Sequence, residues 1–208
     1  MPIKKTWGVI LSTTLVAAAA IPSSALAATA QTPPDVPPID ESTCAHPDFT
    51  QALLPFGDSN LYTLAPGGAF ANATDWQLAN GATITTTTQP DGSAGGVLNL
   101  PGKGQATSPV MCITSDYPTA RLWVRNLEGG DAVSFNVQYY RNGAWTKPKD
   151  NGGFKGDKKN WTLSQEMPVS PDVNNPGWQQ VRFTLLGGGD NRKLQQVDNF
   201  WVDPRASR

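Results

Sequence analysis

Apolar and polar side chains alternate along most of the chain after residue 44. The clearest run, DAVSFNVQYY (131–140), places apolar side chains on one face of an extended strand and mostly polar ones on the other, because successive side chains of a strand point to opposite faces. The runs TARLWVRN (119–126) and WQQVRFTLL (178–186) alternate in the same way. No stretch of this region keeps the 3.6-residue apolar period of a helix. The pattern predicts an all-β protein.

Weaker strand-like runs lie between these and are separated by Gly, Asn, Asp and Pro: LYTL (61–64), DWQLAN (75–80), ATITTTT (82–88), GVLNL (96–100) and SPVMCIT (108–114). Strands with one buried and one wet face predict a two-sheet antiparallel β-sandwich, a jelly roll, whose inner faces form the core. The stretch KPKDNGGFKGDKKNW (147–161) has no periodicity, so it is predicted to be a mobile loop.

The first residues have the features of a secretion signal peptide, predicted to span 1–27. Lys4 and Lys5 precede an apolar stretch, and Ala25-Leu26-Ala27 matches a signal-peptidase site. The apolar stretch is too short for a spanning helix, so no stable membrane insertion is expected after cleavage. Residues 28–43 are predicted to be a proline-rich linker and residues 44–205 the folded domain. We expect a secreted protein, extracellular or associated with the cell wall.

The chain has two cysteines, Cys44 and Cys112. In an exported protein an even count predicts a disulfide, and two cysteines allow one connectivity. Closing so long a loop would stabilise the fold by about 4 kcal/mol in the chain-entropy treatment. Two free buried thiols are the alternative.

Charge and composition argue against several functions. Loss of Lys4 and Lys5 with the signal leaves 14 of the 16 basic residues against 17 acidic ones, a formal charge of −3. Without a basic stripe, nucleic acid is an unfavourable partner. The chain's one histidine, His46, lies next to Cys44 outside any predicted strand, so nucleophile schemes that need a histidine base have none within the strands. We expect a protein that is not an enzyme.

Several motifs resemble a family of small secreted, mostly uncharacterised actinobacterial proteins. They are LPFGD (54–58), YTLAPGGAF (62–70), SPVMC (108–112) and VDNFWVDP (197–204). The likeness covers nearly all of residues 44–205. More loosely, the early G-x-F, the late W-x-x-V-x-F strand and the terminal strand look like jelly-roll carbohydrate-binding modules with a galactose-binding-like sandwich. The resemblance implies the same sandwich and suggests a glycan-binding role.

Asp198 stands between core-forming residues of the last strand, where a carboxylate costs several kcal/mol unless it is paired or solvated. In many modules of the resembled type, this aspartate and an acidic residue after the G-x-F help to hold a structural calcium. Here Ala71 occupies the early position, and calcium normally takes six to eight oxygens. Three interpretations stay open: a calcium ligand, a hydrogen-bond acceptor at a strand bulge, and an edge carboxylate facing water.

Polar and aromatic side chains on the wet faces of the two clearest strands suggest a binding surface. These predicted ligand-binding residues are Arg121, Trp123, Arg125, Asn136, Gln138 and Tyr140. Flat rings beside amides and guanidinium groups suit a sugar, which has C–H faces and hydroxyls. If the strand at 178–186 lies in the same sheet, Gln180, Arg182 and Thr184 extend the surface.

The simpler interpretation is that these polar residues only solvate an outer face and that a loop covers Trp123. Trp145 and Trp161, which flank the lysine-rich stretch, are either binding platforms or anchors that pin it. The expected function is non-catalytic carbohydrate binding. The alternative is a structural or protein-interaction module of the cell envelope, so the expected partner is a glycan or a cell-envelope component.

Overall fold

The computed structural model describes residue 44, residues 47–72, 74–115, 118–129, 131–170, 172 and 174, and residues 177–204. The predicted signal peptide (1–27), the linker (28–43) and His46 lie outside these residues. Within the described part of the chain, no helix has the length and apolar character needed to span a membrane. The one helical turn of this part, η1 (Leu54–Phe56), is a short 3₁₀ turn.

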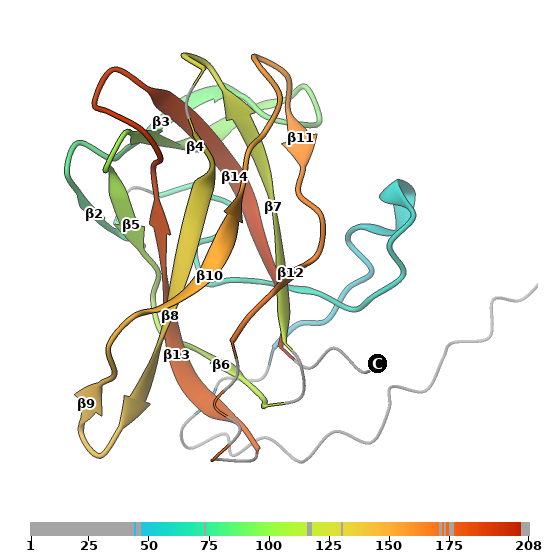
Figure 1. Ribbon diagram of the computed structural model, residues 1–208. Helices are drawn as coiled ribbons and strands as arrows, with labels where there is room; N and C mark the ends of the chain where they lie inside the picture. The colour runs from blue at the N-terminus through green and yellow to red at the C-terminus, as the bar shows by residue number, and fades with distance from the viewer. Residues whose placement is uncertain are drawn as a thin grey trace, which may run out of the picture. The chain divides into compact units, whose positions relative to one another are not determined.

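The described residues form two antiparallel sheets, as the alternation predicts (Figure 1). Sheet I has the order β11-β7-β14-β4-β3, with β1 paired to β14 and β12 paired to β7. Its strands are β1 (Thr63–Leu64), β3 (Thr83–Thr88), β4 (Ala94–Pro101), β7 (Thr119–Asn126), β11 (Thr162–Leu163), β12 (Met167–Pro168) and β14 (Leu194–Asp203).

Sheet II has the order β10-β8-β13-β5-β2, with β6 paired to β13 and β9 paired to β8. Its strands are β2 (Gln77–Ala79), β5 (Gln105–Thr107), β6 (Met111–Ile113), β8 (Val133–Arg141), β9 (Ala144–Trp145), β10 (Lys149–Phe154) and β13 (Gln179–Leu186). The two sheets make the predicted jelly-roll sandwich. Every strand pair in the described sheets is antiparallel.

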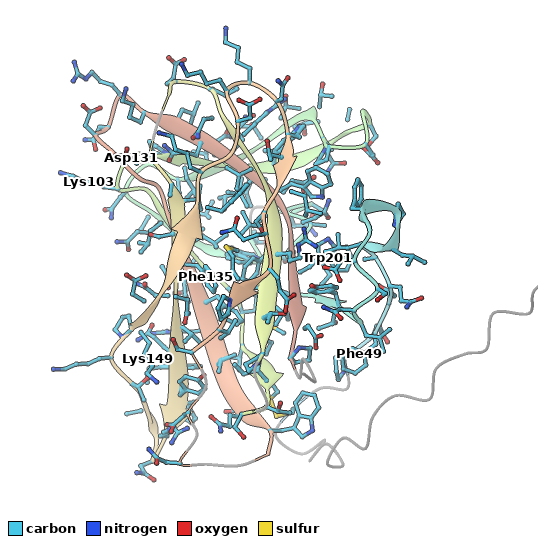
Figure 2. All side chains as sticks on the ribbon, turned by 45° about the vertical axis from the view of Figure 1, so that its right-hand side comes forward. Phe49, Lys103, Asp131, Phe135, Lys149 and Trp201 are labelled. Carbon is cyan, nitrogen blue, oxygen red and sulfur yellow. A yellow bond between two sulfur atoms is a disulfide. The ribbon has the colours of Figure 1, made fainter. Side chains whose placement is uncertain are left out.

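The core fills the space between the sheets. The alternating apolar residues on one face of each of the three clearest runs are buried there, and they are Val133, Phe135, Val137 and Tyr139 of β8, Ala120, Leu122 and Val124 of β7, and Val181, Phe183 and Leu185 of β13. Phe200 packs at ring-centroid distances of 5.3 Å from Phe183 and 6.0 Å from Phe135, so the two sheets meet through one aromatic cluster. Figure 2 shows Phe135 within the sandwich and Lys149 projecting away from it.

The prediction for residues 147–161 is wrong in part, because residues 149–154 form strand β10. This strand pairs with β8 at the edge of sheet II, and its register shifts between Asp150 and Gly153. Gly152 has φ +79°, a conformation that glycine adopts without strain. A bulged, glycine-containing edge strand has no period-2 apolar pattern, since an edge strand packs few side chains into the core.

The disulfide between Cys44 and Cys112 is confirmed. Cys112 belongs to β6, so the bridge fastens the start of the described chain to sheet II. Both cysteines are buried, with 3% and 7% of their surface exposed.

Candidate functional site

The six predicted ligand-binding residues do not form one surface. Strand β7, which carries Arg121, Trp123 and Arg125, belongs to sheet I, whereas β8, which carries Asn136, Gln138 and Tyr140, belongs to sheet II. Side chains that point away from the core on the two sheets of a sandwich face opposite directions. The prediction of a single six-residue patch is therefore wrong. The three residues on β7 and the three on β8 belong to two separate surfaces, which are described in turn.

On sheet I, the Arg121 side chain binds other residues of the domain. Its guanidinium forms an ion pair with Asp58 and donates two hydrogen bonds to the Ser164 carbonyl oxygen, at 2.9 and 2.6 Å. Burial alone would raise the pKa of Asp58, but hydrogen bonds from Arg121, the Asn60 backbone and Tyr62 outweigh it and lower that pKa. Arg121 thus fastens two loops to the sheet and has few donors left for a ligand.

Trp123 and Arg125 are also covered by neighbouring segments. Phe56 of η1 packs edge-on against Trp123, with ring centroids 5.0 Å apart. The Arg125 guanidinium lies 4.5 Å from the centre of the Trp161 ring and donates to Gln196 Oε1 at 2.6 Å. On this sheet the simpler interpretation of the sequence, a loop over Trp123, is confirmed.

On sheet II, a tight hairpin sets two aromatic rings side by side. Strands β8 and β9 are joined by Asn142-Gly143, whose φ angles of +49° and +79° are those that a two-residue hairpin turn of the Asn-Gly kind requires. The turn sets the register so that Tyr140 lies directly opposite Trp145. Their ring centroids are 5.2 Å apart, and 44% of the Tyr140 surface is exposed.

Arg182 of the neighbouring strand β13 completes this aromatic pair. Its guanidinium lies 4.6 Å from the centre of the Trp145 ring, and its Nε donates to Gln138 Oε1 at 3.0 Å. Gln138 in turn donates from Nε2 to the Thr146 carbonyl oxygen at 2.7 Å. These contacts hold the Trp145 ring and the Arg182 guanidinium in place before a ligand binds. Less conformational entropy is therefore lost on binding.

The same sheet leaves several polar groups available. Among the described residues, the Tyr140 hydroxyl, the Asn136 amide and the Nη groups of Arg182 have no hydrogen-bond partner. We call this surface the β8–β13 face and define it by Asn136, Gln138, Tyr140, Trp145, Arg182 and Thr184. Aromatic rings beside free amide, hydroxyl and guanidinium groups can stack on a sugar ring and hydrogen-bond its hydroxyls.

The strand predicted at 178–186 lies in the same sheet as β8: it is β13, which pairs with β8 and places Arg182 opposite Gln138. The sequence left open which segment covers sheet I, and the cover comes from Phe56 and Asp58. Both belong to the LPFGD motif, whose Phe next to a glycine was the available signal.

Asp198 is fully buried, so the interpretation as an edge carboxylate facing water is wrong. It lies where the pairing of β14 with β7 shifts register, before Asn199, whose φ is +49°. The carboxylate accepts hydrogen bonds from the Asn199 backbone N–H at 2.9 Å and the Asn199 Nδ2 at 3.1 Å. The interpretation as an acceptor at a strand bulge is therefore confirmed.

Calcium at Asp198 stays a prediction. The described residues include no group of three or more Asp, Glu, His or Cys side chains placed to hold a metal ion. Asp91 is the acid whose charge acts on Asp198. Calcium sites usually take several carboxylate or carbonyl oxygens, so two acids supply a smaller ligand set than is usual.

Burial raises the pKa of Asp198 to about 6. Because this pKa lies above the value in the unfolded chain, the folded chain binds more protons than the unfolded chain between about pH 4 and pH 6. The contribution of protonated Asp198 to the free energy of unfolding is therefore full below pH 4 and is lost as the pH rises through 6. We expect Asp198→Asn to gain stability relative to the wild type as the pH rises from 4 to 7. Urea unfolding of both proteins across this range measures the difference, and two parallel pH profiles would contradict it.

The same proteins test the calcium prediction at pH 7. If calcium binds at Asp198, it raises the melting temperature of the wild type but not that of Asp198→Asn. Identical melting temperatures of the wild type with calcium and with a chelator would show that calcium does not bind at Asp198.

No protein-family model and no curated protein matches the sequence. Solved structures are similar to it at low identity. The xylan-binding domain from Paenibacillus barcinonensis Xyn10C is 13% identical with a TM-score of 0.44, over 67% of this chain and 94% of that one. The family 11 carbohydrate-binding module from Clostridium thermocellum, solved with a mixed-linked tetrasaccharide, is 13% identical with a TM-score of 0.40, over 69% and 97%. An arabinose-bound α-L-arabinofuranosidase is 15% identical with a TM-score of 0.42, over 67% of this chain and 26% of that one. The candidate site therefore rests on this chain's own geometry.

Proposed function

We propose that this chain is a secreted, non-catalytic carbohydrate-binding module that holds a glycan on the β8–β13 face. The observation that carries the proposal is the fixed cluster of Tyr140, Trp145 and Arg182, in which an exposed ring is set beside a guanidinium that keeps free donors. Sugar rings present apolar C–H patches and directional hydroxyls, and such a cluster offers a partner for each.

The neighbouring polar groups support the same proposal. Asn136 and Thr184 lie directly opposite each other on β8 and β13, next to the pair formed by Gln138 and Arg182. An extended glycan crossing these two strands would meet amide, hydroxyl and guanidinium groups in succession. An open row of this kind suits a chain rather than a small molecule that needs enclosure.

The chain's chemistry supports a binding role and an oxidising compartment. The disulfide between Cys44 and Cys112 is of the kind found in exported proteins. Binding needs no reactive group, whereas the hydrolysis of a glycosidic bond needs two opposed carboxyl groups. The β8–β13 face as defined contains no carboxyl group.

Replacing Tyr140 by alanine is expected to weaken glycan binding about tenfold, because it removes the exposed ring while leaving the core residue Tyr139 in place. Affinity electrophoresis in gels containing xylan, galactan or mixed-linked β-glucan measures the retardation of the wild type and the variant. Phe56→Ala is the matched control, since Phe56 is an aromatic residue with 55% of its surface exposed beside sheet I.

The proposal predicts that at least one polysaccharide retards the wild type and Phe56→Ala equally and retards Tyr140→Ala much less. If all three proteins are retarded equally, the glycan binds elsewhere. If none of them is retarded by any neutral or acidic polysaccharide tested, the chain is not a carbohydrate-binding module.

One observation favours the alternative, a protein-interaction module of the cell envelope. Leu54 and Phe56 on η1 have 53% and 55% of their surface exposed, next to Trp123, and exposed apolar side chains that lie together mark interaction sites. A photo-crosslinking residue in place of Phe56 would capture one defined envelope protein in the producing cell under this alternative. The same residue at Tyr140 is the control, and equal crosslinking from both positions would contradict a specific partner at η1.

A further inference from the structure

A separate cavity of about 410 Å³ lies where the two sheets approach each other near the disulfide. Its walls come from β1 and β14 of sheet I, from the segment 110–112 that contains the start of β6, and from Pro47, Asp48 and Thr50. Figure 2 shows Trp201 on β14, beside the early segment that carries Phe49. None of the residues of the β8–β13 face lines this cavity, so it is a different site.

The walls are mainly apolar. They are formed by Pro47, Leu64, Val110, Met111 and Trp201, with the Cys44–Cys112 disulfide beside them. Val110 keeps 48% of its surface exposed, although it lies next to buried residues of β6. The volume falls in the range of pockets that enclose a small organic molecule. An apolar body of that size would be desolvated on entry, which favours binding.

Two residues give the cavity a chemical preference. One is Trp201, which is half-buried and brings an indole ring to the lining; its N–H can only donate a hydrogen bond, so the ring and not the N–H is what can attract a cation. Among the described residues that line the cavity, Asp48 is the one ionisable side chain. Within the described part of the chain its carboxylate has no ion-pair partner, because the ion pairs there involve Asp58, Asp172 and Asp190.

The site is thus a mainly apolar cavity whose described lining includes one indole ring and one acidic side chain. An ammonium group is attracted by a tryptophan ring and by a carboxylate, and an apolar stem fills the remaining space. An anion would be repelled by Asp48 and would meet no cation among the described lining residues. We infer that this cavity binds an ammonium group carried on an apolar stem, either a small organic amine or a lysine side chain of another protein.

The test uses the full chain and phenethylammonium as the probe, with phenylacetate and 2-phenylethanol as its anionic and neutral counterparts. Binding is followed by the side-chain indole signals in ¹H–¹⁵N spectra, and Trp201→Phe identifies the Trp201 signal. We expect a saturable shift of that signal with phenethylammonium and a weaker one with 2-phenylethanol. Asp48→Asn should weaken phenethylammonium about fivefold and leave 2-phenylethanol unchanged, since a partly exposed ion pair contributes up to about 1 kcal/mol.

Each arm decides one part of the inference. No shift of the Trp201 signal with phenethylammonium, or equal affinity for phenylacetate, would overturn it, as would an Asp48→Asn variant that binds the cation as tightly as the wild type. N-acetyl-lysine amide separates the sources: binding as tight as that of phenethylammonium supports a protein side chain, and much weaker binding supports a free amine. These measurements do not depend on glycan retardation, so they test the cavity independently of the β8–β13 face.

Discussion

Replacing Phe200 by alanine is expected to lower the free energy of unfolding by about 3–5 kcal/mol. Phe200 of sheet I is fully buried and packs against rings on the opposite side of the core: its centroid lies 5.3 Å from Phe183 and 6.0 Å from Phe135, both of sheet II, and 6.1 Å from Trp76, which precedes β2. Truncation removes these contacts and leaves a cavity that surrounding strands, held by backbone hydrogen bonds, cannot fill. Urea unfolding monitored by circular dichroism measures the change.

Phe56→Ala provides the control for this measurement, because it truncates the same type of side chain at an exposed position. We expect it to change the free energy of unfolding by less than about 1 kcal/mol. If both variants lost the same stability, the aromatic cluster between the sheets would not be the main support of the sandwich.

Removing the disulfide is expected to cost about 4 kcal/mol. The bridge joins positions separated by 68 residues, so its loss frees a long loop in the unfolded chain and raises the entropy of that state. The double variant Cys44→Ala/Cys112→Ala should therefore unfold at a much lower urea concentration than the oxidised wild type.

Treatment with a reductant distinguishes the bridge from the side chains themselves. It should bring the wild type down to the stability of the double variant and leave the variant unchanged. A reduced wild type as stable as the oxidised one would show that packing alone holds the start of the domain against β6.

Local alternation in the sequence was enough to predict which side chains point inward. On β8 the residues from Val133 to Tyr139 alternate between core and surface as expected, because the two-residue period of a strand depends only on backbone geometry. The same pattern predicted the all-β sandwich. The disulfide followed from the cysteine count.

The sequence did not show which sheet each strand joins. Strands β7 and β8 follow each other along the chain with similar patterns, yet one pairs with β14 and the other with β13. Pairing of this kind depends on contacts between residues far apart in sequence, which no local period encodes. For that reason Trp123 and Tyr140 were predicted on one surface and lie on two.

The segment that covers sheet I could not be predicted for the same reason. The contact of Trp123 with Phe56 and the ion pair of Arg121 with Asp58 join segments more than 60 residues apart. In contrast, the pairing of Tyr140 with Trp145 was within reach of the sequence, because Asn142-Gly143 is a strong signal for a two-residue hairpin. Strand β10 was not predicted, because its bulge and glycines remove the alternation of apolar and polar side chains.

Mapping a bound glycan onto the backbone tests the central claim most directly. The oligosaccharide of whichever polysaccharide retards the protein would be titrated into ¹⁵N-labelled protein, with the amide signals assigned. Binding on the β8–β13 face predicts saturable shifts concentrated in β8, β9 and β13, including Tyr140, Trp145 and Arg182. Shifts centred instead on β7 and β14, around Trp123, would contradict it.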